Sequence, residues 1–385
     1  MKKKILLICH SSEKSGGGED DFLRIIKFLK DKHETFGAFP HGPRENIFSQ
    51  YVNEHFYMSN KHFPLMGLNI RYFISRSYIK NFFQTVFALR GFIKKNKDLN
   101  LVILNSSVCY IEALVLSYYK VPYIIFLREK LNPHNFRKFI YKLYNKHAYK
   151  IIAVSEYLKD IFLKYEYSDK IEVLNAPIEE NFYEKVRLEF SKSSSDKKND
   201  IFIITQIGAV GILKSQETTL KALRELKGKK IIADKKILLK LIGKFQNDDY
   251  YKNLLQLGKS LPENMEVEFT GEISKEDLIR NLLITDCIVI ASKEEGASLV
   301  FSEGLFLEIP VIATNVADLP KMIDNYNNGL IYEKGDFMKL SEYIYEMITN
   351  EELRNRIKEN SRSTYSKYFN LNENLLKLEK IIQSI

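Results

Sequence analysis

The fold is decided by the stretch Asp286-Cys-Ile-Val-Ile-Ala-Ser292, which continues as Lys-Glu-Glu295-Gly-Ala-Ser-Leu-Val-Phe-Ser-Glu303-Gly-Leu-Phe-Leu-Glu-Ile-Pro310-Val-Ile-Ala-Thr314. It predicts a short buried strand, a polar turn with glycine, a helix of about ten residues and a second buried strand that Pro310 opens. This order is typical of a parallel α/β unit, in which ligands bind at the carboxyl ends of the strands.

Two carboxylates fall at that end, Glu295 in the turn and Glu303 inside the helix. At the rise of an α-helix they lie about 7–8 Å apart along the axis, so one molecule with two hydroxyl-bearing ends could contact both. The backbone amides of residues 296–298 would crown the helix N-terminus, where partial positive charge favours a phosphate. A solvated turn residue and one member of a polar helix face are the simpler interpretation of an isolated pair.

The spacing Glu295, seven residues, Glu303, followed by Pro310-Val-Ile-Ala-Thr314, resembles the signature of family 4 glycosyltransferases. The resemblance covers nearly the whole chain and is strongest over residues 267–314. It implies a retaining, nucleotide-sugar-dependent enzyme of the GT-B fold: α/β, with two Rossmann-like domains and the donor in a cleft between them. It also implies that Glu295 lies by the donor sugar and that Glu303 holds the ribose hydroxyls.

Further donor contacts are implied at the ends of other predicted strands. Residues 201–207, Gly208 and Lys214 resemble the family's strand, glycine turn and lysine, and a lysine suits a diphosphate as a compact charge. Ala209 stands where relatives commonly carry arginine. The strands that end at Gly243 and Gly271 would flank the nucleotide base. The implied donor-binding residues are Gly16, Gly17, Gly18, Gly208, Lys214, Gly243, Thr270, Gly271, Glu295, Gly296, Ala297, Ser298, Leu299 and Glu303.

The N-terminal half begins with a predicted strand, the glycine turn of residues 15–19 and a helix over residues 20–30. A glycine turn lets backbone amides approach a phosphate closely, and by resemblance this turn faces the donor diphosphate. Arg128 follows the predicted strand of residues 122–127, at the end where acceptor chemistry is expected. We expect Glu295, Lys214 and Arg128 to be catalytic. Many relatives carry a histidine near Arg128, and this chain does not. A structural salt bridge is an equally good interpretation of Arg128.

The resemblance divides the chain into two domains. Residues 1–185 would form a Rossmann-like acceptor-binding domain, and residues 186–366 a Rossmann-like nucleotide-sugar-binding domain. The last helix, residues 367–385, would pack back on the first domain. Residues 191–200 are small, polar and charged, which is typical of a linker.

Composition indicates a globular protein, with 45% hydrophobic and 28% charged residues among 385. The three cysteines are scattered and show no disulfide or metal spacing, which favours a reducing cytoplasm. The apolar run after Met1 is too short for a signal peptide, and nowhere do 18 apolar residues follow one another. We therefore expect a cytoplasmic protein, either free or peripheral on the inner face of the cytoplasmic membrane.

The net charge of +9 indicates anionic partners, and its distribution is uneven. No acidic residue occurs between Glu54 and Asp98, while lysine, arginine and phenylalanine interleave there. Residues 61–97 and 130–150 are therefore candidates for contact with an anionic membrane surface. Core helices with solvated basic faces are an equally good interpretation.

No Asp-x-Asp motif and no His/Cys cluster occurs, so we expect no metal and no cofactor besides the nucleotide-diphosphate sugar that serves as donor. The predicted reaction is transfer to a glycan or lipid-linked acceptor in bacterial cell-surface polysaccharide assembly, with no nucleic acid as partner. Three alternatives stay open: a GT-B epimerase or phosphorylase, a catalytically inactive relative, and a basic nucleic-acid-binding protein. The last lacks any recognisable nucleic-acid-binding motif.

Overall fold

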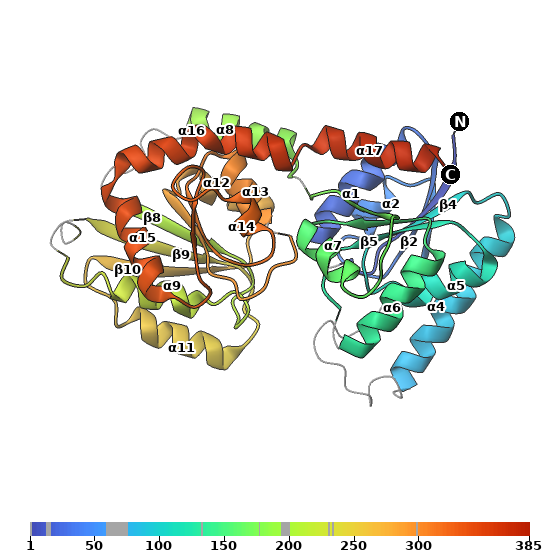
Figure 1. Cartoon of the computed structure of the whole chain (residues 1–385), viewed down its shortest axis with the longest axis horizontal. Helices are drawn as coiled ribbons and strands as arrows, with labels where there is room; N and C mark the ends of the chain where they lie inside the picture. Colours follow the sequence, from blue (N-terminus) through green and yellow to red (C-terminus); the bar gives the residue numbers. More distant parts are fainter. Residues whose placement is uncertain are drawn as a thin grey trace. The chain divides into compact units, whose positions relative to one another are not determined.

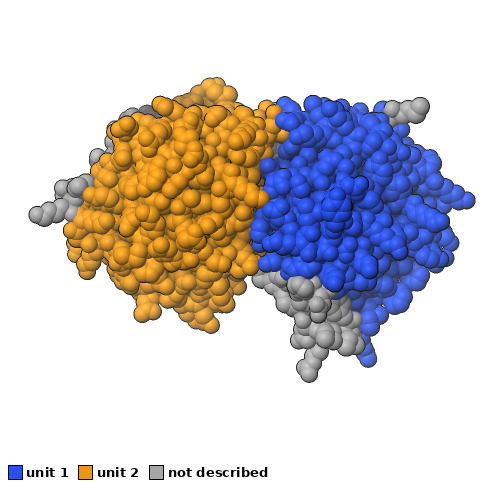
Figure 2. Space-filling view, viewed as in Figure 1, with its two compact units in different colours: residues 1–176, 371–385 blue, residues 177–370 orange. Residues whose placement is uncertain are grey.

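The structure, a computed structural model, describes residues 2–12, 17–58, 76–131, 134–176, 178–193, 201–229, 232, 235–297 and 299–385. The chain forms two compact units, which Figure 2 shows in different colours. Unit 1 comprises Met1–Ala176 and Leu371–Ile385, and unit 2 comprises Pro177–Asn370. Each unit is a parallel sheet between two layers of helices (Figure 1).

The sheet of unit 1 has the strand order β3-β2-β1-β4-β5-β6-β7, and every pairing is parallel. Its central strands are continuous apolar runs because helices cover both faces of the sheet. The strands are β1 (Lys4–Ile8), β2 (Glu34–Phe39), β3 (Glu54–Tyr57), β4 (Leu101–Leu104), β5 (Tyr123–Leu127), β6 (Lys150–Ala153) and β7 (Ile171–Val173).

The helices of unit 1 lie on both faces of this sheet. They are α1 (Gly17–Lys30), α2 (Glu45–Ser49), α4 (Arg76–Lys95), α5 (Tyr110–Tyr119), α6 (His134–His147), α7 (Glu156–Leu163) and α17 (Leu371–Gln383). Helices α1 and α17 lie on one face, and α4, α5 and α6 on the other (Figure 1). Two contacts hold α17 in this unit: Glu379 Oε2 lies 3.0 Å from His33 Nε2, and Asn374 Nδ2 donates to the carbonyl of Asn175 at 2.7 Å.

The sheet of unit 2 has the order β10-β9-β8-β11-β12-β13 and is also parallel. Its strands are β8 (Ile201–Ile207), β9 (Lys236–Ile242), β10 (Met265–Gly271), β11 (Cys287–Ile290), β12 (Val311–Thr314) and β13 (Leu330–Tyr332). Its helices are α8 (Glu180–Ser193), α9 (Gln216–Arg224), α11 (Asp248–Gly258), α12 (Lys275–Leu283), α13 (Leu299–Phe306), α14 (Leu319–Met322), α15 (Phe337–Thr349) and α16 (Glu351–Tyr368). They bury two apolar clusters; α9 packs on α11 and α15, α8 packs on α12, and α13 packs on α16.

Three sequence-based boundaries differ from the structure. The boundary at residues 185/186 falls inside α8, whose Tyr183 and Val186 are buried in an apolar core of unit 2, so the units divide at residues 176/177 instead. Residues 191–193 of the predicted linker end α8, and residues 194–200 lie outside the described residues. Helix α1 begins at Gly17, so Gly17 and Gly18 form its first turn; Gly16 lies outside the described residues.

None of the helices in the described ranges is both long enough and apolar enough to cross a bilayer. Cys9, Cys109 and Cys287 are all buried, and none of them forms a disulfide.

Candidate functional site

The candidate site lies in unit 2, where the strand order reverses. Strand β8 pairs with β9 on one side and with β11 on the other, so the chain leaves β8 and β11 in opposite directions. In open parallel sheets ligands bind at the carboxyl ends of two such strands. Lys214 follows β8 and Glu295 follows β11, so both stand at this position.

Lys214 and Glu295 form an ion pair. The Nζ of Lys214 lies 2.5 Å from Glu295 Oε1, and Ser292 Oγ donates to the same carboxylate oxygen at 2.6 Å. The side chain of Glu295 is 10% exposed and that of Lys214 is 26% exposed. A carboxylate so nearly buried needs such charge-assisted partners, and the ammonium stays accessible to a further anion. Two of the three predicted catalytic residues therefore meet.

The loops that carry this pair are tied to the sheet and to each other. Gln206 Nε2 donates to the carbonyl of Lys214 at 2.6 Å, and Thr219 Oγ1 donates to Gln206 Oε1 at 2.7 Å. The amide of Lys293 donates to the carbonyl of Leu213 at 2.8 Å, which joins the loop after β11 to the loop after β8. The backbone around Lys214 is thus fixed from both sides.

Glycines make room for the lysine stem. Gly208 has φ +136°, and a Cβ there would lie 2.9 Å from Cε of Lys214. Gly243 has φ +149°, and its Cβ would lie 2.2 Å from the carbonyl oxygen of Gly208. Only glycine tolerates a positive φ together with so close an approach at the Cβ position. The amide of Gly208 donates to Ile242 and that of Gly243 to Gly271, so the three predicted glycines follow one another along the carboxyl ends of β8, β9 and β10.

Glu303 lies on α13 and is 7% exposed. The hydroxyl of Tyr183 donates to its Oε1 at 2.5 Å, and the Tyr183 ring packs edge-on against Phe306 with centroids 6.0 Å apart. Tyr183 comes from α8, 120 positions away in the sequence. No local pattern predicts this contact, and the sequence analysis missed it.

The remaining predicted donor residues occupy the turns around α13 and β10. Helix α13 begins at Leu299, whose amide donates to the carbonyl of Ala297 at 3.1 Å; Gly296 precedes them and Ser298 lies outside the described residues. The hydroxyl of Thr270 donates to the carbonyl of Gly271 at 3.1 Å. The Leu299 amide and the Thr270 hydroxyl thus bond to neighbouring backbone carbonyls in the structure.

Arg128 follows β5 in unit 1 and takes part in a buried ion pair. Its Nη1 lies 2.7 Å from Asp21 Oδ2, and its Nε donates to the side chain and to the carbonyl of Asn105 at 2.8 and 2.9 Å. The Arg128 side chain is 6% exposed, and a Cβ on Gly18 would lie 3.0 Å from its Cδ. Gly18 therefore packs against Arg128, and the structure shows the salt bridge that was the alternative interpretation of this arginine.

Two carboxyl groups of unit 1 have shifted pKa values. Burial alone would raise the pKa of Asp21, but the guanidinium groups of Arg128 and Arg24 outweigh it and hold that pKa below its usual value. Burial raises the pKa of Glu112, on α5, to about 7, and its Oε2 has no hydrogen-bond partner among the described residues. Asp21, Asn105 and Glu112 were not singled out from the sequence, although Asn105 directly follows β4, where the strand order of unit 1 reverses.

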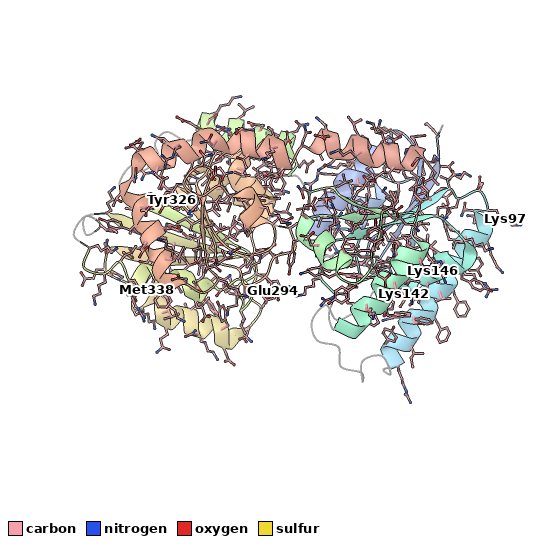
Figure 3. All side chains as sticks on the ribbon, viewed as in Figure 1. Lys97, Lys142, Lys146, Glu294, Tyr326 and Met338 are labelled. Atoms are coloured by element: carbon pink, nitrogen blue, oxygen red, sulfur yellow. The ribbon has the colours of Figure 1, made fainter. Side chains whose placement is uncertain are left out.

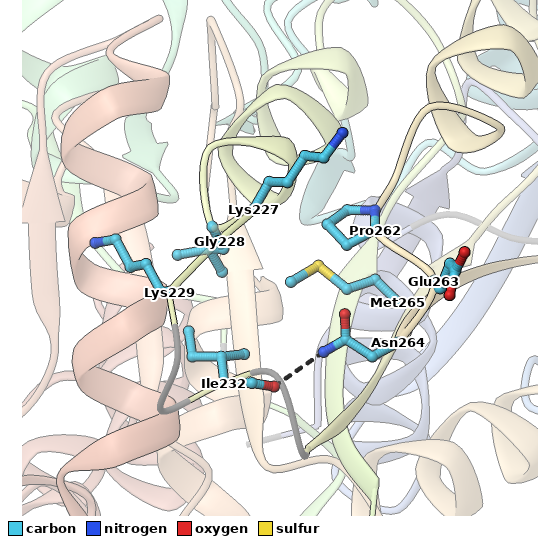
Figure 4. A pocket seen from close by; sticks show the side chains of 9 residues that line it. Lys227, Gly228, Lys229, Ile232, Pro262, Glu263, Asn264 and Met265 are labelled. Atoms are coloured by element: carbon cyan, nitrogen blue, oxygen red, sulfur yellow. Dashed lines mark hydrogen bonds between the residues drawn. The ribbon is translucent and has the colours of Figure 1, made fainter.

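A cavity of about 260 Å³ lies elsewhere in unit 2, lined by residues 226–229, Ile232 and residues 262–265 (Figure 4). Asn264 lines it and donates to the carbonyl of Ile232 at 2.9 Å. Met265 opens β10, so the cavity lies at the amino-terminal edge of the sheet, opposite Lys214 and Glu295. The described residues contain no group of three or more His, Cys, Asp or Glu side chains placed to hold a metal ion.

Residues 188–364, nearly all of unit 2, match the family described as glycosyl transferases group 1. This segment is thus similar to group 1 glycosyl transferases. The likeness agrees with the resemblance to family 4 glycosyltransferases, and Lys214, Glu295 and Glu303 all lie within the matched residues.

Two relatives extend the likeness beyond unit 2. An uncharacterised glycosyltransferase of Methanocaldococcus jannaschii is 26% identical over 249 residues, which are 64% of this chain and 63% of that protein. The capsular polysaccharide biosynthesis glycosyltransferase CapM of Staphylococcus aureus is 31% identical over 228 residues, which are 57% of either chain. The matches thus span less than two thirds of the length of these curated relatives.

Solved structures confirm the fold. HepE of Anabaena in complex with UDP has a TM-score of 0.77 at 17% identity, and the match covers 100% of both chains. A glycosyltransferase from Rickettsia africae also has a TM-score of 0.77, at 22% identity, over 100% of this chain and 98% of that one. The predicted GT-B fold is confirmed.

Proposed function

We propose that the protein is a glycosyltransferase, which moves a sugar from a nucleotide-diphosphate sugar to a glycan or lipid-linked acceptor in cell-surface polysaccharide assembly. The observation that carries the proposal is the Lys214–Glu295 pair at the strand reversal of the family-matched unit. The activity named for CapM and the UDP and UDP-glucose bound in the HepE structures support a nucleotide sugar as donor.

Each residue of the pair has a role that suits its chemistry. The Lys214 ammonium has three donors, so it can keep Glu295 and contact a diphosphate oxygen together. Charge grows on the diphosphate as the glycosidic bond lengthens, and a fixed ammonium stabilises that charge. Glu303, held by Tyr183, would accept hydrogen bonds from the ribose hydroxyls. No step requires a metal ion.

Transfer would proceed with retention of the anomeric configuration. The bond from the anomeric carbon to the diphosphate oxygen breaks as the bond to the acceptor oxygen forms on the same face of an oxocarbenium-like sugar. The acceptor proton passes to the departing diphosphate. Glu295 is engaged by Lys214 and Ser292, which suits a positioning role better than that of a nucleophile.

The experiment is a product analysis after donors are chosen by thermal shift. A nucleoside diphosphate or nucleotide sugar that prefers the native state raises the melting temperature. The protein is then incubated with each stabilising sugar nucleotide, with and without candidate glycan and lipid-linked acceptors. Release of nucleoside diphosphate that depends on acceptor supports transfer, whereas conversion of the donor sugar without acceptor identifies an epimerase.

Two variants separate donor binding from chemistry. Lys214→Ala should lower kcat by about 10²–10³, which is typical for loss of one group that stabilises transition-state charge. Glu303→Ala should chiefly weaken donor binding, roughly tenfold or more, because hydrogen bonds to a charged group are lost. Lys252→Ala, on the exposed surface of α11, is the control. Full activity in both site variants would refute the assignment.

A further inference from the structure

Helices α4, α5 and α6 form one side of unit 1, and α5 packs against both of the others (Figure 1). They cover one face of the sheet, and their outer sides face solvent. Residues 61–75, part of the stretch expected to contact a membrane, lie outside the described residues, and the described part of this side comprises residues 76–131 and 134–147.

The exposed stripe of α4 mixes large apolar and basic side chains. Ile79, Phe83 and Phe87 are 44%, 50% and 60% exposed, and the rings of Phe83 and Phe87 stack with centroids 6.1 Å apart. They recur at the spacing of one helix face. The exposed cations of the same helix are Arg76, Lys80, Arg90, Lys94 and Lys95.

Helices α5 and α6 continue this composition. Tyr118 is 80% exposed and Phe139 57% exposed, and Leu114 is also exposed. Figure 3 shows Lys142 and Lys146 on α6, which also carries the exposed Lys138. We call these exposed side chains of α4, α5 and α6 the basic aromatic face.

The basic aromatic face lacks negative charge. Across α4, α5 and α6 the sequence has a single acidic residue, Glu112, and it is 1% exposed. Single exposed apolar residues are normal on a soluble protein and need no explanation. Three large apolar side chains recur along one helix stripe, and the charged side chains exposed on these three helices are lysines and arginines apart from the histidine at the end of α6. This is instead the pattern of helices that lie in the interface of an anionic bilayer.

Two other partners fit less well. A second copy of the chain, joined through the same face on both sides, would bring cations against cations. Nucleic acid would match the charge, and its bases could stack on phenylalanine, but the aliphatic Ile79 and Leu114 offer no stacking platform. A lipid interface takes both the aromatic and the aliphatic side chains and supplies the negative charge.

We propose that the basic aromatic face docks unit 1 on an anionic lipid bilayer. The apolar side chains of α4 enter the boundary between headgroups and acyl chains, and the lysines of α6 pair with lipid phosphates. This inference does not depend on the proposed enzymatic activity, because it concerns a surface apart from Lys214 and Glu295.

The first test is co-sedimentation of the full chain with vesicles of phosphatidylcholine, with and without phosphatidylglycerol. Binding should require the anionic lipid. Lys138→Gln, Lys142→Gln and Lys146→Gln together should weaken it about a hundredfold, since each cation near an anionic leaflet contributes about fivefold. The matched control removes the same charge from unit 2 through Lys236→Gln, Lys252→Gln and Lys259→Gln, and should bind as the wild type does.

A second test reports insertion directly. The chain contains no tryptophan, so Phe87→Trp introduces a single indole at the most exposed position of the stripe. Its emission should shift to the blue with anionic vesicles. Met338→Trp, at a position 53% exposed on α15 of unit 2 (Figure 3), should show no shift. Phe83→Ser with Phe87→Ser should reduce the binding that persists at high salt, where screening suppresses the electrostatic part.

The two vesicle experiments separate membrane docking from the other partners. Binding that depends on phosphatidylglycerol, falls in the α6 triple variant and shifts Phe87→Trp emission supports the proposal. It is overturned by absence of vesicle binding, by equal loss in the control triple variant, or by equal shifts at both tryptophans. It is also overturned if the face variants affect only oligonucleotide binding or only self-association in sedimentation velocity.

Discussion

The two units place an ion pair at the same kind of position and use it differently. Each sheet is parallel, and each has a cation and a carboxylate near the carboxyl ends of its central strands. Arg128 and Asp21 lie 2.7 Å apart in unit 1, and Lys214 and Glu295 lie 2.5 Å apart in unit 2. The arginine is 6% exposed and also bound to Asn105, whereas the lysine is 26% exposed.

The difference lies in what the cation can still do. A guanidinium held by a carboxylate, a side-chain amide and a backbone carbonyl has a fixed geometry. If Arg128 moved away, the Asp21 carboxylate would stay buried without this ion pair. A lysine ammonium on a flexible stem can turn toward a new anion while it keeps the old one. In both units the topology places a charge at the ends of the strands. Burial then decides whether that charge stabilises the fold or is available to a ligand.

The largest expected effect is on the stability of unit 1. Arg128→Met should destabilise the protein by about 3–5 kcal/mol, because it leaves the Asp21 carboxylate buried with only Arg24 as a charged partner. Urea denaturation measures the change. Lys214→Met should lower the free energy of unfolding by less. Glu295 keeps its hydrogen bond from Ser292, and Lys214 is already partly exposed to water in the folded protein. A variant Arg128→Met that unfolds like the wild type but transfers no sugar would show that Arg128 acts on substrate.

A smaller effect concerns Glu112 and pH. Its folded pKa of about 7 lies above its usual value of 4.5, so the native state holds a proton that the unfolded state releases first. Stability from this group is complete below pH 4.5 and declines as pH rises to 7, by about 3 kcal/mol. Glu112→Gln should remove this decline and raise the melting temperature at pH 8. Parallel melting curves for variant and wild type between pH 5 and 8 would contradict it.

The smallest effect is expected at Tyr183. Tyr183→Phe removes one hydrogen bond to a carboxylate, worth about 1–2 kcal/mol, so donor affinity should fall several-fold while kcat changes little. Titration calorimetry with the nucleoside diphosphate measures this. Tyr332→Phe is the matched control, because that buried hydroxyl has no hydrogen-bond partner among the described residues. Equal affinities for both variants would remove Tyr183 from the site.

The sequence predicts the parts of this structure that local pattern governs. The strand–turn–helix–strand order around Glu295 correctly predicts the parallel strands β11 and β12 with α13 between them. What it misses depends on distant contacts: Tyr183 reaches Glu303 across 120 positions, and Asp21, on α1, reaches Arg128, which follows β5. The predicted domain boundary at residues 185/186 differs from the structure for a related reason. The apolar face of α8 belongs to unit 2 through tertiary packing, which no local pattern shows.

The position of α17 has a consequence for synthesis on the ribosome. The sequence of unit 1 is interrupted by the whole of unit 2. The contact between His33 and Glu379 therefore cannot form until unit 2 has been synthesised. At usual elongation rates about 10–40 s separate the emergence of residue 176 from that of α17. Most of unit 2, which is contiguous, is made during that interval, whereas its core residues Tyr365 and Phe369 are made just before α17. The nascent N-terminal sheet therefore has to accept its final helix after the strands of unit 2 have been made.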